Sequence, residues 1–346
     1  MASTIPALSS TAASEVQSRL DRKTKPTGSL GRLEELAVSL AAMSGKVDGV
    51  FARKVVLVAA GDHGVARQGV SLYPPEVTPQ MVLNFLSGGA AINVLARRAG
   101  ARVVVADAGV NSEALPKHPG LLNFSAGRGT ADFSQGPAMS KALAQTCVDN
   151  GRAALRILAA EGLDLLALGE MGIGNTSASS ALCACLLGLD VEAVTGRGTG
   201  LDAEARQRKV EVLRKALKLN APDPADPLDC LAKVGGFEIG LLAGAMLEAA
   251  SHRIPVVLDG FITGAAALVA CRMDPALKGF LLASHQGREP GHRLVLEHLG
   301  LRAYLNLDLR LGEGSGAALF LPLVDVTHSL LAEMATFESA GVSDKA

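Results

Sequence analysis

Short apolar stretches rich in valine, leucine and alanine alternate along the middle of the chain with longer segments of helical spacing. Five such stretches each end in Gly, Asp, Glu, Ser or His, and they begin at Lys54, Ala101, Leu163, Ile254 and Gly279. Helical segments fall at residues 137–161, 176–187, 238–252 and 290–299. Strands that are apolar throughout and separated by helices indicate a parallel sheet covered on both faces. The pattern therefore predicts an α/β fold with a doubly wound, Rossmann-like parallel sheet.

The two ends of the chain show helical patterns and no strands. In KPTGSLGRLEELAVSLAAM we expect Ser29 to cap a helix that begins near Leu30. Another helical pattern runs from Gly314 to about Ala340. At 346 residues the chain exceeds the usual length of one domain. We expect a small helical domain made of residues 1–50 plus 305–346, beside a large α/β substrate-binding domain of residues 51–304.

Composition limits the kind of ligand and the compartment. A net charge of −1 gives no electrostatic footprint for nucleic acid, so we expect small-molecule substrates. The five cysteines are odd in number and scattered, which is typical of reduced thiols in a cytoplasmic protein. No stretch of about 18 apolar residues lacks charge, so we expect no membrane span. The seven histidines show no metal-ligand spacing, and we expect neither a metal nor a cofactor.

The predicted strands end in polar residues, and these mark the candidate site. In open parallel sheets, ligands bind outside the carboxyl ends of the strands. Those ends carry Asp62, His63, Asp107, Glu170, Asp259, Ser284 and His285. Asp259 and Ser284 are candidates for substrate binding. No nucleophile elbow and no second histidine at ligand spacing accompanies Asp62 and His63, so we expect that pair to hold loops in place.

The sequence GEMGIGNTSASSAL follows an apolar stretch and opens a helix. Gly172 and Gly174 allow a turn whose backbone N–H groups face outward, and Asn175, Thr176 or Ser177 begins the helix. Such a helix N-terminus can bind a phosphate through backbone dipoles, although a plain strand-to-helix turn is the alternative. The loop matches neither the dinucleotide motif nor the Walker loop. Glu170 favours a functional site, because an acid beside a phosphate costs electrostatic energy unless it has a role.

A second glycine-rich loop, TGRGTGLD, also suits a close ligand approach. Its candidate binding residues are Gly198, Thr199 and Gly200. We expect Asp202 to cap the following helix, which carries Lys209. A lysine in such a helix is often a solvated surface charge. If the loop faces the strand ends, Lys209 is a cation for a phosphate or a carboxylate.

Two further acids have weaker local signals. PVVLDGFITGAAAL superficially resembles the loop by which many phosphoribosyltransferases hold phosphoribosyl pyrophosphate, but it carries only Asp259 where those loops carry two adjacent acids. The difference argues against a magnesium-pyrophosphate donor. Glu313 lies between Gly312 and Gly314, at the start of the last helical pattern. Taken alone it is a helix-cap residue, since carboxylates favour helix N-termini.

Taken together and in this order, these motifs resemble the nicotinate-nucleotide:dimethylbenzimidazole phosphoribosyltransferase family, which makes the lower-ligand nucleotide of cobalamin. The motifs are KPTGSLGRLEELA, AGDHGV, EVTPQM, GEMGIGNTSAS, GRGTGLD, KVGGFEIGLLAGAMLEAA, PVVLDGFITGAAAL, SHQ and LRLGEGSGAAL, and they span Lys25 to Leu319. The resemblance implies transfer of 5-phosphoribosyl from nicotinate mononucleotide to 5,6-dimethylbenzimidazole, giving α-ribazole 5′-phosphate and nicotinate. It also implies a homodimer.

The resemblance further implies roles for individual residues. Glu313 corresponds to the general base, and Glu170 and Lys209 correspond to residues that assist it. The glycine loop would hold the 5′-phosphate. Residues of the benzimidazole pocket would include Tyr73, Gln80 and Met81, but the segment SLYPPEVTPQM is longer and more aromatic than in the family. The preferred acceptor base is therefore left open.

Two other functions remain as alternatives. One is a transferase that uses phosphoribosyl pyrophosphate as its donor. The other is a non-enzymatic regulatory module that binds a nucleotide or a cobamide precursor. Glu313 is the residue that distinguishes an enzyme from the binding module, because a binding module needs no general base.

Overall fold

A parallel six-stranded sheet forms the centre of the computed structural model, which describes residues 4–113, 115–198 and 200–343. Its strand order is β3-β2-β1-β4-β5-β6. The strands are β1 (Lys54–Gly61), β2 (Ala101–Gly109), β3 (Leu121–Asn123), β4 (Leu165–Met171), β5 (Val256–Leu258) and β6 (Leu281–Ala283). This is the order of a doubly wound sheet, and it confirms the predicted fold class.

The five predicted strands are all present, and the sixth, β3, lies at an edge. Every residue of β1 is buried, and its neighbours β2 and β4 are buried over most of their length. Burial on both faces explains why these strands are apolar throughout. In β3, Leu121 and Leu122 are partly buried and Asn123 is exposed, so its sequence carries no comparable apolar signal.

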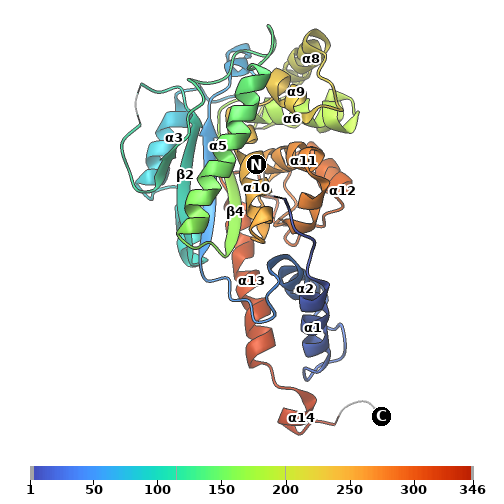
Figure 1. The fold of residues 1–346 in the computed structure, drawn as a ribbon. Coiled ribbons are helices and arrows are strands. Elements are labelled where there is room, and N and C mark those ends of the chain that lie inside the picture. Colours follow the sequence, from blue (N-terminus) through green and yellow to red (C-terminus); the bar gives the residue numbers. More distant parts are fainter. Residues whose placement is uncertain (1–3, 114, 199, 344–346) are drawn as a thin grey trace.

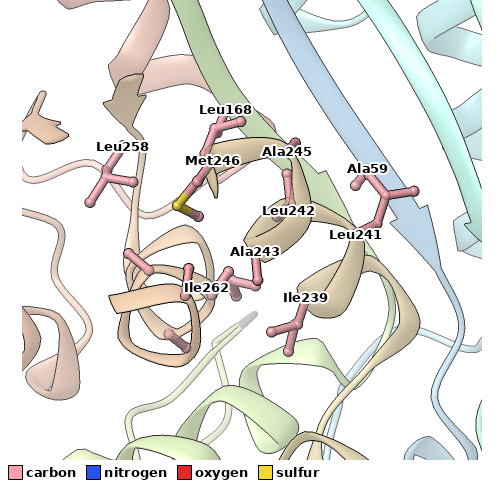
Figure 2. Packing of buried hydrophobic residues seen from close by; sticks show 14 of the residues in the cluster. Ala59, Leu168, Ile239, Leu241, Leu242, Ala243, Ala245, Met246, Leu258 and Ile262 are labelled. Atoms are coloured by element: carbon pink, nitrogen blue, oxygen red, sulfur yellow. The ribbon is translucent and has the colours of Figure 1, made fainter. Parts of the chain in front are cut away.

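Helices cover both faces of the sheet (Figure 1). On one face Leu168 of β4 packs beside Met246 of α10 (Phe237–Ser251), as Figure 2 shows. The next residue, Gly169, lies against the start of α13 (Ser315–Glu333), where an added Cβ would come within 2.5 Å of the Glu313 carbonyl oxygen. Successive side chains of a strand point to opposite faces, so α10 and α13 cover opposite sides of β4.

The remaining helices of this part surround the sheet and its carboxyl edge. Around the sheet are α3 (Val77–Leu86), α4 (Ala91–Arg98) and α5 (Lys141–Ala160), with α5 packed on α10. Toward the carboxyl edge are α6 (Asn175–Leu187), α7 (Val191–Val194), α8 (Ala203–Asn220), α9 (Pro227–Val234), α11 (Phe261–Met273) and α12 (Pro290–Leu299). Two short 3-10 helices are η1 (Gly64–Gln68) and η2 (Pro275–Phe280). The helices predicted between strands are all confirmed, within a few residues at their ends.

Helices from both ends of the chain lie together, below the sheet in Figure 1. They are α1 (Ser10–Asp21), α2 (Arg32–Ser44), the end of α13, and α14 (Phe337–Ala340). Buried residues of α1 and α2 form a small apolar cluster of their own, against which Leu331 of α13 packs. Other residues of α2, including Leu36 and Leu40, belong to the main core. The division of the chain into domains at residues 50 and 305 stays a prediction.

The expected cap at Ser29 is wrong. Helix α2 begins at Arg32, and its N-cap is Gly31, which makes no side-chain hydrogen bond. The N–H of Leu30 instead donates to the carboxylate of Glu34 at 2.9 Å, and Glu34 also pairs with Lys25 at 2.8 Å. Glu34, inside the helix, therefore holds the residue that precedes the N-cap, and Gly31 takes the place predicted for the serine.

Helix α13 is, among the described residues, the one helix long and apolar enough to cross a membrane. Its first residues are buried, however, and they pack against β4. In its second half, Asp325 pairs with Lys54 at the start of β1 at 2.5 Å. These contacts are those of a core helix that links the sheet to the terminal helices.

Candidate functional site

A cavity opens at the carboxyl ends of β4, β5 and β6, next to the end of β1 where the strand order reverses. It is lined by residues 170–173, 175, 176, 198, 260–262, 285, 287–289, 292 and 309–313. Open α/β sheets bind ligands at this topological switch point. The cavity brings together six of the sequence-predicted site residues, which are Glu313, Glu170, Gly172, Asn175, Thr176 and Gly198.

Glu313 reaches the cavity from a strained piece of backbone. Gly312, Glu313 and Gly314 all have positive φ angles, of 83°, 63° and 87°. The left-handed region costs a residue with a side chain about 1–2 kcal/mol, so the surrounding structure must impose it. The close contact with Gly169 of β4 supplies part of that constraint, because any side chain at position 169 would displace the Glu313 backbone.

Two buried carboxyl groups face this cavity, and both hold their protons more tightly than usual. Burial raises the pKa of Glu313 to about 7, with a further contribution from the charge of Asp259. Burial also raises the pKa of Glu170 to about 8, aided by Asp259 and Glu238, although a hydrogen bond from Asn175 opposes the shift. Near pH 7 the pair can therefore present one acid and one base, which is the requirement for moving a proton.

The glycine loop before α6 has the geometry expected of a phosphate-binding turn. Gly174 is the N-cap of α6 with a φ of 99°, and the helix begins at Asn175 as predicted. A Cβ at Gly172 would overlap the carbonyl group of Gly61 at the end of β1, so the loop needs glycine there. The hydroxyl of Thr78, in α3, accepts a hydrogen bond from the N–H of Ile173 at 3.1 Å and holds the loop from the other side.

Lys209 lies directly behind this loop. It is 1% exposed, and its Nζ donates to the hydroxyl of Thr176 at 2.8 Å. Burial lowers the pKa of Lys209 to about 8, while the charge of Glu289 opposes the shift. Asp202 caps α8 as predicted, accepting from the N–H of Ala205 at 2.8 Å. The lysine is thus a buried cation at the phosphate end of the cavity and not a solvated surface charge.

Asp259 has a different place from the one expected. It does not line the cavity, and its carboxylate accepts the backbone N–H groups of Gly314, Gly316 and Ala317 at 3.2, 2.8 and 3.0 Å. A carboxylate at a helix N-terminus is stabilised by the unpaired N–H groups and by the helix dipole. Asp259 therefore anchors the start of α13, and through it the backbone of Glu313.

The other predicted site residues lie outside the cavity lining. Ser284 is fully buried, and its hydroxyl lies 3.0 Å from Nδ1 of His285. Gly174 and Gly200 contribute backbone turns near the cavity. Thr199 lies outside the described residues. Tyr73 and Gln80 are exposed and Met81 is partly buried in the segment around α3.

The pair expected to hold loops does so. Asp62 accepts the N–H of Asn111 at 2.8 Å, and Nε2 of His63 lies 2.8 Å from a carboxylate oxygen of Glu238. Burial works against a charged His63, yet the carboxylates of Glu238 and Asp62 outweigh it and raise its pKa. Because the His63 side chain also packs against Gly172 and Gly174, it supports the glycine loop before α6.

Sequence reasoning missed one wall of the cavity. Arg288, Glu289 and His292 come from the start of α12, and Arg310 precedes Glu313. His292 is buried and its pKa falls to about 3 through burial, so the ring is neutral. A usable signal was present in SHQGREPGH, where a charged loop with a Glu-Pro helix start directly follows a strand end.

No group of three or more metal-ligating side chains gathers within the described ranges 4–113, 115–198 and 200–343. The site instead combines two protonatable acids, a helix N-terminus and a buried lysine. That combination suits an anionic ligand whose reacting end exchanges a proton with a carboxylate.

Comparison with known proteins identifies the family. A family model described as phosphoribosyltransferase matches residues 5–342. Two similar proteins named nicotinate-nucleotide–dimethylbenzimidazole phosphoribosyltransferase are each 54% identical. The one from Chloroflexus aggregans matches over 96% of this chain and 94% of its own length. The one from Roseiflexus castenholzii matches over 99% and 96%.

A solved structure agrees. The crystal structure of nicotinate-nucleotide-dimethylbenzimidazole phosphoribosyltransferase from Thermus thermophilus superposes with a TM-score of 0.92 at 49% identity. The match covers 98% of this chain and 100% of that one. The similarity thus extends over the whole fold, cavity and terminal helices included.

Proposed function

Because the chain belongs to the nicotinate-nucleotide–dimethylbenzimidazole phosphoribosyltransferase family, we propose that it transfers 5-phosphoribosyl from nicotinate mononucleotide to 5,6-dimethylbenzimidazole. The products are α-ribazole 5′-phosphate and nicotinate, for assembly of the nucleotide loop of cobalamin. One observation carries the proposal. Glu313, with a pKa of about 7, lines the same cavity as the glycine loop that precedes α6. A base and an anion site thus face one bound nucleotide.

The phosphate end fixes the nucleotide. The N–H groups at the start of α6 and the hydroxyl of Thr176 would contact the 5′-phosphate, with Lys209 as the neighbouring cation. Gly198 lies against Thr176 and completes this wall. Holding the phosphate here directs the ribose C1′ along the cavity toward Glu313 and Glu170, which is the positioning that makes the displacement effectively intramolecular.

At the other end, the reaction is a displacement at C1′. The bond from C1′ to the pyridinium nitrogen breaks, and its electron pair leaves with nicotinate. One imidazole nitrogen of the acceptor base bonds to C1′ from the opposite face, so the β nucleotide gives the α product. The other imidazole N–H passes its proton to the Glu313 carboxylate. Glu170, still protonated near pH 7, can donate a hydrogen bond beside it.

A direct assay tests the function. The protein is incubated with nicotinate mononucleotide and a panel of benzimidazoles, purines and phenols, and nicotinate release is followed by mass spectrometry. We expect release that depends on the added base, with dimethylbenzimidazole among the accepted bases. Turnover that requires magnesium and phosphoribosyl pyrophosphate, with none from nicotinate mononucleotide, would establish the alternative donor.

Replacement of the base separates an enzyme from a binding module. In Glu313→Ala we expect base-dependent nicotinate release to fall by about 10²–10⁴-fold, the usual contribution of a general base. Nucleotide binding, measured by calorimetry, should persist because the phosphate loop is untouched. Near-normal turnover in this variant would sink the assignment of Glu313.

We propose further that the protein is a cytoplasmic homodimer. Two apolar side chains at or near the cavity remain exposed, namely Leu72 and Leu311 at 59% and 55%. Leu311 itself lines the cavity, and Leu72 lies beside Gly200 of the second glycine loop. A second copy would cover them, since exposed apolar surface next to a site is typical of an interface. Light scattering coupled to size exclusion measures the oligomeric state, and a monomer at micromolar concentration would contradict the proposal.

A further inference from the structure

Glu289 joins two walls of the cavity that come from distant parts of the chain. It is the N-cap residue of α12, directly before Pro290, and its own side chain makes no cap hydrogen bond there. Instead, its Oε1 accepts the backbone N–H of Gly198 at 2.9 Å. A Cβ at Gly196 would overlap this carboxylate and would lie 2.7 Å from Cδ of Pro290. The glycine loop around Gly198 is thus packed tightly onto the start of α12.

Gly198 also lies next to Lys209, the cation at the phosphate end of the cavity. A Cβ at Gly198 would lie 3.2 Å from Oγ1 of Thr176 and 3.6 Å from Nζ of Lys209. Glu289 therefore holds, through one backbone N–H, the segment that covers Lys209. If that hydrogen bond were lost, the loop would be free to move away from both groups.

Only one of the two carboxylate oxygens of Glu289 accepts a hydrogen bond within the described residues. Its Oε2 is buried and has no hydrogen-bond partner within the described part of the chain. Among the described residues of α6, which packs against α8, none is charged. The charged groups of the other elements against α8 are occupied elsewhere: Glu192 lies near Arg206 and Arg214, and Asp229 pairs with Lys233 at 2.9 Å. Glu289 is the charge that acts on buried Lys209.

We propose that Glu289 is a positioning residue of the phosphate site, which fixes the glycine loop of residues 196–198 onto α12 and holds its carboxylate charge close to Lys209. The inference rests on the proposed function, since it presumes that the cavity binds the 5′-phosphate of a nucleotide. Nothing in the reaction requires Glu289 to touch the reacting atoms. Its effect should therefore appear in nucleotide affinity and in the dependence of that affinity on pH.

Glu289→Gln tests the charge while preserving the shape. Its amide oxygen can still accept from Gly198, so the loop stays anchored, but the negative charge near Lys209 is removed. Lys209 then loses its proton at lower pH. We expect the KM for nicotinate mononucleotide, relative to wild type, to be little changed at pH 6 and raised by up to about tenfold at pH 8. The kcat at saturating nucleotide should change much less.

A control variant, a conservative variant and a folding measurement accompany this test. Glu297→Gln removes a carboxylate from the surface of the same helix, where it pairs with Arg293, and should leave KM unchanged at every pH. Glu289→Asp retains the charge and should restore the wild-type pH dependence even if the shorter side chain weakens the loop contact. Circular dichroism establishes that each variant is folded.

Sulfate supplies a readout independent of turnover, because its charge is constant over this pH range. Its dissociation constant, measured by calorimetry on wild type and Glu289→Gln from pH 6 to pH 8.5, should diverge between the two proteins as the pH rises. The role of Glu289 would be overturned if the ratio of Glu289→Gln to wild type stayed constant with pH, both for KM and for the sulfate dissociation constant. Wild-type protein that binds sulfate as described but releases no nicotinate would refute the proposed function and leave the role of Glu289 supported.

Discussion

The shifted pKa values of three side chains predict how activity depends on pH. Glu313 must be ionised to accept a proton, and its pKa of about 7 places the rising limb of kcat there. Lys209 must be protonated to hold phosphate, and Glu170 must keep its proton to donate, and both have a pKa of about 8. We expect a narrow bell-shaped profile of kcat/KM with its maximum between these values. Steady-state rates from pH 5.5 to pH 9.5 measure it, and a plateau extending beyond pH 9 would contradict it.

The raised pKa of Glu170 lowers the stability of the folded protein, and this effect can be measured separately from activity. Its carboxyl keeps a proton up to about pH 8 in the folded protein, but ionises near 4.5 in the unfolded chain. As the pH rises from 4.5 toward 8, the unfolded chain loses this proton first, so the raised pKa makes folding less favourable. Glu170→Gln ionises in neither state. Its Tm should match that of wild type near pH 4 and exceed it at pH 8, by about 1–2 °C for each kcal/mol recovered.

The same variant should keep part of its activity, because its amide N–H can still donate the hydrogen bond proposed for the protonated Glu170. Thermal unfolding followed by circular dichroism at both pH values gives the comparison, and Glu297→Gln, an exposed exchange of the same kind, is the control. An equal Tm difference at pH 4 and pH 8 would mean that the effect comes from packing and not from the proton.

Local sequence predicts some site residues much better than others. Glu170, Asn175 and Thr176 follow a strong strand and a glycine turn, so their place at the cavity is fixed by a few neighbouring residues. Asp259 was misplaced because its partners lie 55 or more residues away, at the start of α13. Glu289 escaped notice for the same reason, since its contact with Gly198 depends on how two distant loops meet.

At the scale of elements, α13 depends on an acid from another element. Asp259 follows β5 and satisfies three N–H groups at the start of α13, next to the strained Glu313. In Asp259→Ala these buried donors lose their partner, and we expect a stability loss of about 1–3 kcal/mol. We also expect a larger fall in kcat than in nucleotide affinity, because the displaced group is Glu313 and not the phosphate loop. Denaturant unfolding and steady-state kinetics measure the two effects.

Asp274→Ala is the matched control for that experiment. Asp274 caps η2, accepting the N–H of Ala276 at 3.0 Å, and it lies away from the cavity lining. It should lower stability without lowering kcat. If both variants reduce kcat to the same extent, loss of stability alone explains the result, and the anchoring role of Asp259 fails.

Helices and strands were predictable from the sequence wherever burial produced a periodic pattern of hydrophobic residues. The strands β1, β2 and β4 are long and apolar, so the sequence pattern locates them within a residue or two. The start of α2 was misjudged because its N-cap is Gly31, with a φ of 54°, and a glycine has no capping side chain that would mark the position. Strand β3 has two partly buried residues and one exposed residue, and its pairing with β2 is decided by tertiary structure.

For the whole molecule, strand order explains why one cavity collects the chemistry. Neighbours of β1 are β2 on one side and β4 on the other, so the chain leaves the sheet in opposite directions at this point. The loops that follow β1 and β4 lie against each other at this point, with His63 of the first next to Gly172 of the second. The sequence predicted which strand-end residues lie at the carboxyl edge of the sheet. It did not predict that residues 285–289 and 309–313 meet at that edge.

We predict that the helices from the two ends of the chain form a second unit, less stable than the sheet. Leu20 of α1 is 1% exposed and lies in the small cluster shared with α2, apart from the main core. Leu20→Ala removes buried methyl groups there, at a cost of about 2–5 kcal/mol. If residues 1–50 and 305–346 form a domain of their own, amide hydrogen exchange should accelerate in α1 and in the end of α13, while β1 and β4 keep their wild-type protection. Because α2 also contributes to the main core, faster exchange throughout the sheet would instead mean one cooperative unit, and would contradict the predicted boundaries at residues 50 and 305.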